Sequence, residues 1–254
     1  MRVSILGNGV AGKQHEQIWQ SLGCKTRTFG PGQEPDKSDI LSIATPDNLH
    51  INAILEVGGR TPIFCEKPLS HDAAALREWN DGGGGAPIGV HLPLVFHPPF
   101  LELKQAIPTF GKIYLWEAEY NYGRRHKIET GWRSEPWYDI MCGGGIHMVH
   151  LLLWLGCPFN DKTWPFPFGN RWAKQYMGYG TDGSLIRVSA NFGHEGDHQH
   201  VVSIWGDKGT ARITNEGEID KVPAFADFLD RIKNNKPTNF NEALRANRLC
   251  LVNP

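Results

Sequence analysis

The chain has 254 residues, of which 40% are hydrophobic and 21% charged, so it can form one large or two small globular domains with a core. Its net charge of -1 excludes a broad electrostatic attraction to nucleic acid or to an anionic membrane, and no apolar run approaches the length that spans a bilayer. The five cysteines are dispersed without a CxxC pair, which favours reduced thiols over a disulfide framework or a zinc site. The first residues run directly into a predicted strand and resemble no signal peptide. We therefore expect a cytoplasmic protein with no nucleic-acid or membrane partner.

A glycine-rich turn joins the first predicted strand, residues 2–6, to a predicted helix over residues 13–22. Gly7 permits a tight turn, Gly9 lets a pyrophosphate approach the backbone, and Gly12 lets the helix pack close to the strand. The first N–H groups of the helix then face the anion. The alternative is an ordinary strand-to-helix turn that is rich in glycine. The residues predicted to bind a dinucleotide here are Gly7, Asn8, Gly9, Val10, Ala11 and Gly12.

The second predicted strand, residues 25–29, is not followed by the acidic residue that commonly binds the adenosine ribose in such folds. Arg27 lies close to this end, where it would meet a 2′-phosphate or remain a solvated strand residue, and both alternatives stay open. Residues 30–39 are too few for a helix and a further strand before the next apolar run, residues 40–45. We therefore expect the usual third βα unit to be missing or reduced to a loop.

Strands and helices alternate through the rest of the first half. This order predicts a parallel, doubly wound sheet. The expected elements are helices over residues 48–57, with Asp47 as N-cap, and 72–80, with Ser70 as cap, and strands over residues 62–65 and 88–94.

The pattern changes close to His97, and we place a domain boundary between residues 95 and 96. Residues 112–122 alternate between polar and apolar, as in a half-exposed strand. An apolar helix is expected from Gly143 to Leu155, with Gly156 as its end. Further strands are predicted over residues 185–192, 200–205 and 210–214, and helices over 100–106, 224–233 and 242–251. This half is expected to be α+β with a mostly antiparallel sheet.

Four stretches, in this order, carry a family resemblance. They are Gly7-x-Gly9-x-x-Gly12-x-x-His15, Ala44-Thr45-Pro46-x-x-x-x-His50, Glu66-Lys67-Pro68 and Gly144-x-x-His147, and a Gly206-x-x-Gly209 hairpin follows them. Together they resemble the glucose-fructose oxidoreductase / inositol dehydrogenase / rhizopine catabolism (Gfo/Idh/MocA) family along nearly the whole chain.

The resemblance implies an α/β fold with a reduced, Rossmann-like parallel sheet in residues 1–95. It implies a C-terminal α+β domain with an open, mostly antiparallel sheet in residues 96–254, which binds substrate and oligomerises. It also implies NAD(P)-dependent redox chemistry on a small-molecule substrate, a sugar, polyol or sugar nucleotide, in a homodimer or homotetramer formed through the C-terminal sheet. The sequence does not choose between NAD and NADP.

Lys67 and His147 are the predicted catalytic residues. Lys67 follows the end of a parallel strand, where doubly wound sheets bind ligands, and Pro68 restricts the backbone beside it. An ammonium group there can orient a substrate hydroxyl and lower the cost of removing its proton, whereas the alternative is a surface ion pair with Glu66. The resemblance places His147 at the family's catalytic histidine, where imidazole can take the hydroxyl proton; the alternative is a helix-start histidine that bonds backbone.

Two positions depart from the family pattern. Gly143 stands where many members have an aspartate four residues before the histidine, and His150 stands where many have an aspartate three residues after it. His150 lies one turn from His147 and is predicted to bind substrate, together with Arg124 and Trp132 from the irregular segment before the helix. For these two, a solvated loop and packing are the alternatives. The missing acid leaves open a weakened or lost activity.

The remaining cofactor-binding residues are predicted from the motifs. They are Thr45, Pro46, Asn48, His50, Glu66 and Lys67, with a plain turn as the alternative for Asn48 and a packing role as the alternative for His50. No metal site is predicted. His194, His198 and His200 could join His147 and His150 as ligands of a structural metal, but the chain has no HExxH motif and the His147/His150 pair has no carboxylate at ligand spacing.

The leading hypothesis is therefore an oxidoreductase that transfers hydride between a nicotinamide and a hydroxyl or keto carbon of a sugar, polyol or sugar nucleotide. One alternative is a reductase of a non-sugar substrate, since the family includes a bilin reductase. The other is a non-catalytic dinucleotide sensor that kept the fold.

Overall fold

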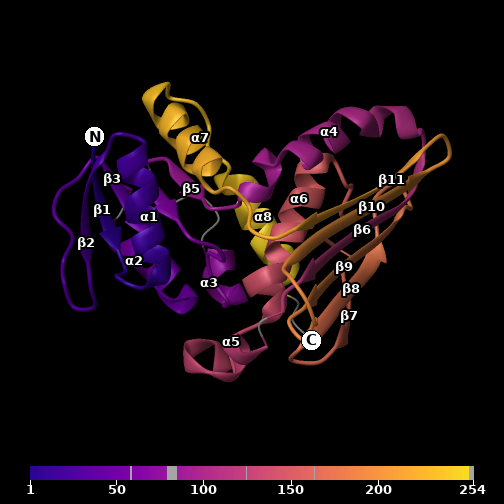
Figure 1. Ribbon diagram of the computed structural model, residues 1–254, viewed down its shortest axis with the longest axis horizontal. Coiled ribbons are helices and arrows are strands. Elements are labelled where there is room, and N and C mark those ends of the chain that lie inside the picture. Colours follow the sequence, from indigo (N-terminus) through magenta and orange to yellow (C-terminus); the bar gives the residue numbers. More distant parts are fainter. Residues whose placement is uncertain (58, 79–84, 124, 163, 252–254) are drawn as a thin grey trace. The chain divides into compact units, whose positions relative to one another are not determined.

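The computed structural model describes residues 1–57, 59–78, 85–123, 125–162 and 164–251 (Figure 1). The chain divides into two compact units. The first unit comprises Met1–Pro93 and Asp220–Leu244, and the second comprises Leu94–Ile219 and Arg245–Pro254. The predicted boundary after residue 95 lies close to the position, between Pro93 and Leu94, where the chain first passes from one unit to the other. The sequence analysis did not predict that Asp220–Leu244 returns to the first unit. No helix in the described part of the chain is long and apolar enough to cross a membrane.

The first unit contains a five-stranded sheet in the order β2-β1-β3-β4-β5. All of its neighbouring strands are parallel, as predicted. The loop between β2 and β3 replaces the third βα unit, because β3 pairs directly with β1. Every residue of β3, β4 and β5 is buried, which explains their apolar composition. The strands are β1 (Arg2–Leu6), β2 (Lys25–Phe29), β3 (Ile40–Ile43), β4 (Ile63–Cys65) and β5 (Ile88–Val90).

Among the described residues, the α-helices that lie wholly within this unit are α1 (Val10–Ser21), α2 (His50–Val57), α3 (Ala73–Glu78) and α7 (Val222–Lys233). The buried residues of α1 recur every three or four positions, and Trp19 is the last of them. Helix α7, from late in the chain, completes this core: the Phe225 ring lies 5.0 Å from that of Trp19 and 4.4 Å from that of Phe64. A Cβ on Gly89 would lie 2.4 Å from the ring of Phe228, so β5 needs glycine at that position for α7 to pack.

The second unit contains a six-stranded sheet in the order β11-β10-β6-β9-β8-β7. Only β6 and β9 are parallel among its named pairs, so the sheet is mostly antiparallel, as predicted. Helix α6 packs against β6, whose buried apolar residues Trp116, Ala118 and Tyr120 alternate along the strand. The strands are β6 (Ile113–Asn121), β7 (Phe166–Gly169), β8 (Ala173–Tyr179), β9 (Leu185–Asn191), β10 (Gln199–Gly206) and β11 (Thr210–Glu216).

Strands β7 and β8 were not predicted. Every residue of β7 is exposed, and β8 buries only Tyr176 and Gly178, so neither strand shows an apolar alternation. Hydrogen bonds to β9 define β8, and β8 in turn defines β7. The helices of this unit are α4 (Pro98–Ala106), α5 (His126–Glu129) and α6 (Ile146–Leu155), and the boundary between the units falls inside α8 (Phe240–Cys250).

Three local predictions need correction. Asp47 makes no N-cap bond; it begins a 3-10 turn, and its carboxylate lies 3.2 Å from His71. The cap of α3 is shared, because Ser70 Oγ accepts the N–H of Asp72 and the Asp72 carboxylate accepts the N–H of Ala74. The helix expected from Gly143 begins as a π-helical turn, Met141–Gly145, which passes directly into α6.

Candidate functional site

The glycine turn of the first unit brings three pieces of backbone together. A Cβ on Gly12 would lie 1.8 Å from the carbonyl oxygen of Gly7, so α1 can start this close to β1 only with glycine there. Gly7 has a φ of 108°, and a Cβ on it would lie 2.4 Å from the carbonyl oxygen of Ala44. Gly9 differs, because nothing lies within 4 Å of the place where its Cβ would be. The turn is therefore packed on the side of the sheet and open at Gly9, before the N-terminus of α1.

Two amide side chains, those of Asn8 and Gln33, lie at the end of β2. Gly30 donates its N–H to Gln33 Oε1 at 2.7 Å, and the Asn8 amide nitrogen would lie 3.0 Å from a Cβ on Gly30. Arg27 forms an ion pair with Asp36 and stands 5.1 Å from the Phe29 ring centroid. The Arg27 side chain is 69% exposed, which agrees with the alternative of a solvated strand residue, and its guanidinium pairs with a carboxylate on the loop before β3.

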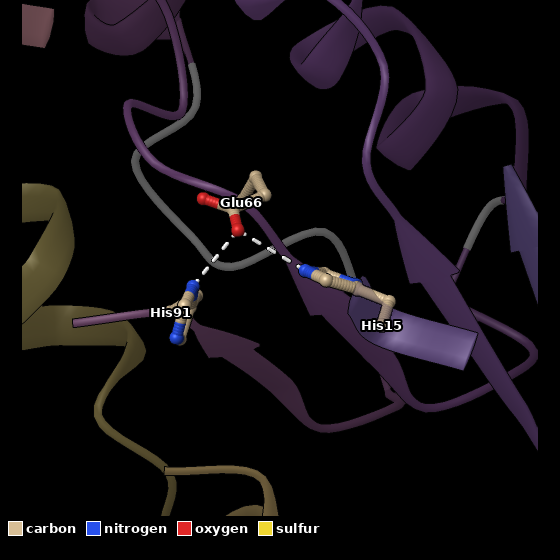
Figure 2. Close-up of side chains that lie close together, drawn as sticks. All are labelled: His15, Glu66 and His91. Atoms are coloured by element: carbon tan, nitrogen blue, oxygen red, sulfur yellow. Dashed lines mark hydrogen bonds and ion pairs between the residues drawn. The ribbon is translucent and has the colours of Figure 1, made fainter. Parts of the chain in front are cut away.

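Glu66, just after β4, connects two histidines (Figure 2). Trp19 donates its indole N–H to Ser42 Oγ at 2.9 Å, which leaves the Ser42 hydroxyl proton for Nδ1 of His15 at 2.8 Å. His15 then donates from Nε2 to Glu66 Oε1 at 3.1 Å. His91, just after β5, donates from Nδ1 to the same oxygen at 2.8 Å. One carboxylate oxygen thus accepts two N–H bonds from two different elements.

The electrostatics of this cluster keep the carboxylate ionised. Burial alone would raise the pKa of Glu66, but His91 and the hydrogen bonds from both rings outweigh burial and hold that pKa well below its usual range. Burial lowers the pKa of His15, so this ring is neutral at pH 7. The possible ligand atoms of His15, Glu66 and His91 lie within 4.8 Å of one another, as the ligands of a metal ion do. Hydrogen bonds of ordinary length nevertheless account for the contacts of Glu66 with both histidines. These hydrogen bonds connect α1 to the ends of β4 and β5, and we call the cluster of His15, Glu66 and His91 the brace.

His50 connects the two other motif turns. Its ring is fully buried, with Nδ1 2.6 Å from the carbonyl oxygen of Pro68 and Nε2 2.9 Å from that of Thr45. The turn that contains Lys67 is therefore tied to the turn at the end of β3. Lys67 itself is half-buried and Asn48 is exposed. The Thr45 hydroxyl is buried and, among the described residues, has no hydrogen-bond partner.

His147 lies in the first turn of α6 in the second unit and is half-buried. Its ring stacks on that of Tyr120 at 5.8 Å between centroids, with 14° between the planes. His150 is only 2% exposed, and burial lowers its pKa to about 4. The ring expected to bind substrate is thus a neutral imidazole inside the packing of α6.

Position 143, four residues before His147, has a glycine in place of an acid and also has no space for an acidic side chain. A Cβ on Gly143 would lie 2.1 Å from the Tyr138 hydroxyl oxygen and 2.6 Å from the carbon that bears it. The phenol therefore occupies the space of a side chain at this position. No rotamer of an aspartate fits there unless Tyr138 moves.

Trp132 lies in a stack of its own within the irregular segment. Its ring is parallel to that of Trp137, at 5.9 Å and 4°, and the Arg133 guanidinium lies 3.9 Å from the Trp132 ring centroid. Arg171 anchors the segment through bonds of 3.1 Å to the carbonyl oxygens of Ile128 and Arg133. Arg124, the other substrate-binding prediction here, lies outside the described residues.

Each unit therefore gathers its own share of the predicted residues. The first unit joins the glycine turn, the Thr45 turn and the Lys67 turn, and the second unit presents His147. Sequence reasoning missed His91, which belongs to no motif and is recognised only because β5 pairs with β4.

No protein-family model matches the sequence. The chain is similar along nearly its whole length to solved dehydrogenase structures, at identities that show the fold alone. GenD2 from gentamicin A biosynthesis, in complex with NAD, is 13% identical with a TM-score of 0.80, over 98% of this chain and 92% of that chain. The myo-inositol 2-dehydrogenase from Lactobacillus plantarum is 14% identical with a TM-score of 0.79, over 98% of this chain and 95% of that chain. The chain has the fold of these dehydrogenases.

Two further comparisons agree with this fold. The scyllo-inositol dehydrogenase from Lactobacillus casei, with bound NAD(H) and scyllo-inositol, is 16% identical with a TM-score of 0.72, over 99% of this chain and 95% of that chain. The curated relative "Oxidoreductase cns1" from Cordyceps militaris is 28% identical over 156 residues, which are 57% of this chain. The match spans only 19% of the length of that relative. The predicted resemblance is thus confirmed at the level of the fold.

Proposed function

We propose that the protein is an NAD(P)-dependent oxidoreductase that transfers hydride between nicotinamide and a hydroxyl or keto carbon of a sugar, polyol or sugar nucleotide. The observation that carries this proposal is the glycine turn, where Gly7 and Gly12 allow contacts that any side chain would block. Solved proteins of this fold include one in complex with NAD and one with NAD(H) and scyllo-inositol, which supports both the cofactor and the substrate class.

The first unit fits a dinucleotide at two points. The open space at Gly9, before the 12-residue helix α1, leaves room for a pyrophosphate beside N–H groups that no side chain of the described residues caps. The buried Thr45 hydroxyl, without a partner among the described residues, offers a donor and an acceptor to a ribose or a carboxamide. When bound, the cofactor supplies a carbon that accepts or returns a hydride.

Lys67 and His147 supply the groups that the protein brings to this reaction. Lys67 is held by its neighbours, because Glu66 is braced by two histidines and Pro68 is bonded by His50. Its ammonium donates to the substrate oxygen and stabilises the negative charge that grows when the hydroxyl loses its proton. His147 takes that proton on an imidazole nitrogen, and returns it in the reverse direction.

The test is turnover measured by the absorbance of NADH or NADPH with a panel of inositols, sugars and sugar nucleotides. Lys67→Ala and His147→Asn are expected to lower kcat by about a hundredfold or more, the usual size of a lost acid–base group. Cofactor affinity is expected to be unchanged in His147→Asn. Lys25→Ala, an exposed lysine on β2, is the matched control and keeps full activity. Full activity in either site variant would contradict the assigned roles.

A non-catalytic dinucleotide sensor is the second candidate, and one observation favours it. Tyr138 closes position 143, so the chain has no room for an acid one turn before His147. Tight binding of NAD or NADP with no turnover on any substrate of the panel would favour the sensor. Measurable turnover would instead show that Lys67 and His147 work without that acid.

We also propose that the protein forms a homo-oligomer through the outward face of the six-stranded sheet. Large apolar side chains stand exposed on its strands: Phe166 is 62% exposed, Tyr179 60% and Trp205 54%. A monomeric protein seldom leaves several such groups in solvent. Sedimentation equilibrium is expected to give a dimer or tetramer, and Trp205→Glu is expected to shift it toward monomer.

A further inference from the structure

A hollow of about 420 Å³, here called the sheet hollow, lies over strands β6, β9, β8 and β7 of the second unit. Its volume falls within the range of about 300–1,000 Å³ that is usual for sites of small molecules. Strand pairing sets one lining residue from each of these strands in a row: Glu119, Ser189, Gln175 and Phe168. Ser189 is the smallest member of this row and lies between longer side chains, which explains why the surface is hollowed there.

The sheet hollow lies on the outward face of the sheet. Successive side chains of a strand point to opposite faces. Tyr120 on β6 is buried on the face that α6 covers, and its ring stacks on that of His147. Glu119 and Asn121, the neighbours of Tyr120 in the strand, therefore point to the other face. The sheet hollow is thus separated from His147 by the sheet itself and is no part of the candidate functional site.

Two opposite charges, those of Arg187 and Glu119, border the sheet hollow. Arg187 on β9 lies directly across from Glu117 on β6, and the two side chains form an ion pair. The Glu117 side chain is 6% exposed and that of Arg187 is 43% exposed, so a buried carboxylate holds a guanidinium that still reaches solvent. Glu119 lies diagonally across from Arg187, a placement that separates the two residues by about 7–8 Å.

The other lining groups add polar atoms and an apolar ring. Asn121 donates an amide N–H to Glu119 Oε2 at 3.4 Å, and the two oxygens of a carboxylate can accept several further hydrogen bonds. Lys174 also borders the sheet hollow, but its ammonium is paired with Asp139. Phe168 on β7 is 54% exposed and presents its ring to this space. The sheet hollow therefore combines a guanidinium, a carboxylate and a phenyl ring within the reach of one small molecule.

We propose that the sheet hollow binds a free α-amino acid with an apolar or aromatic side chain. The α-carboxylate accepts N–H bonds from Arg187, the α-ammonium donates to Glu119, and the side chain of the ligand lies against Phe168. A zwitterion satisfies both charges at once, whereas a simple anion that pairs with Arg187 is repelled by Glu119. This binding function goes beyond the proposed oxidoreductase and does not depend on it.

Isothermal titration calorimetry of the full chain with L-phenylalanine tests the proposal. Two probes each lack one charge: 3-phenylpropanoate has no ammonium, and L-phenylalaninamide has no carboxylate. Each is expected to bind about fivefold to tenfold more weakly than L-phenylalanine, the size of one ion pair that is partly exposed to solvent. Glu119→Gln is expected to weaken L-phenylalanine by the same factor and not to weaken 3-phenylpropanoate, which has no ammonium for the carboxylate to hold.

Two further variants complete the test. Ser189→Leu places a large side chain in the sheet hollow and is expected to abolish binding, while thermal denaturation checks that the variant folds; if it does not, Glu119→Gln decides. Glu216→Gln makes the same chemical change on an exposed residue of β11 that does not line the sheet hollow, and it is expected to leave binding unchanged. The titrations are repeated in Trp205→Glu, because the proposed oligomer uses the same face of the sheet.

Absence of L-phenylalanine binding in both the wild type and Trp205→Glu overturns the proposal. So does equal affinity for the three probes, or wild-type affinity in Glu119→Gln. Binding of NADH, followed by its fluorescence, and turnover are measured in the same preparations, and their failure contradicts the oxidoreductase while the amino-acid site stands.

Discussion

Replacing Glu66 tests the brace that supports the candidate site. Its Oε1 atom accepts N–H bonds from His15 and His91, and both histidine side chains are buried. A hydrogen bond to a charged group contributes about 1.5–3 kcal/mol, so Glu66→Ala is expected to lower the free energy of unfolding by about 3–6 kcal/mol. Glu66→Gln keeps an oxygen acceptor but loses the charge, and is expected to cost about 2–3 kcal/mol.

Urea unfolding at pH 7 gives these differences, and hydrogen exchange of the β3 and β4 amides assigns them to the first unit. The pKa of Glu66 is depressed in the folded state, so the stability it adds is present above the pKa of an unfolded glutamate, about 4.3, and is lost as pH falls through the folded value. The difference between wild type and Glu66→Gln is therefore expected to be constant near neutral pH and to shrink in acid.

The control is Glu56→Ala, which removes an exposed carboxylate on α2 and is expected to change stability by less than about 0.5 kcal/mol. A Glu66→Ala variant as stable as this control would refute the reasoning. So would a Glu66→Gln deficit that grows as the pH is lowered.

Three further outcomes are expected. Gly12→Ala places a Cβ 1.8 Å from the Gly7 carbonyl oxygen, so α1 must shift and NADH binding, followed by fluorescence, is expected to disappear. Phe225→Ala removes a fully buried ring from the first unit and is expected to cost about 3–5 kcal/mol in urea unfolding. Burial lowers the pKa of His150 to about 4 and that of His200 to about 3, so the unfolded state binds more protons than the folded state below pH 6.5. The free energy of unfolding is therefore expected to fall, for each histidine, by up to about 1.4 kcal/mol per pH unit between about pH 6.5 and the pKa of the folded state. In thermal denaturation, His200→Asn is expected to make the melting temperature depend less on pH in this range.

The elements that the sequence predicts well are those whose burial within their own unit leaves an apolar pattern. Strands β3, β4 and β5 are buried throughout and are short apolar runs, and α1 and α7 repeat their apolar residues at helical spacing, so pattern and structure agree. Strands β7 and β8 are held by hydrogen bonds to a neighbour, and their exposed side chains leave no pattern to detect. A prediction based on the periodicity of side chains does not detect strands that are defined by backbone hydrogen bonds alone.

The candidate functional site also contains some residues that the sequence predicted and others that it did not. Motif spacing predicted the glycine turn, and Gly7 and Gly12 have the close contacts that this prediction needs. The spacing did not indicate His91, whose partner is set by strand pairing, or Tyr138, which fills the space beside Gly143. The assignment of Lys67 as a catalytic group stays a prediction.

Helix α7 is synthesised long after the rest of the first unit, and this order has a consequence for folding on the ribosome. Met1–Pro93 contains all five strands of the parallel sheet, but the rings that cover it, Phe225 and Phe228, belong to Asp220–Leu244. At ordinary translation rates the intervening segment takes roughly 6–25 s to make. During that interval Phe64 has the rings of His15, Trp19 and His91 beside it but lacks those of Phe225 and Phe228. The backbone of Gly89 also lacks Phe228. A nascent chain of this length is thus expected to expose this part of the apolar core, and a stop codon before Asp220 leaves the first unit without the helix that completes its core.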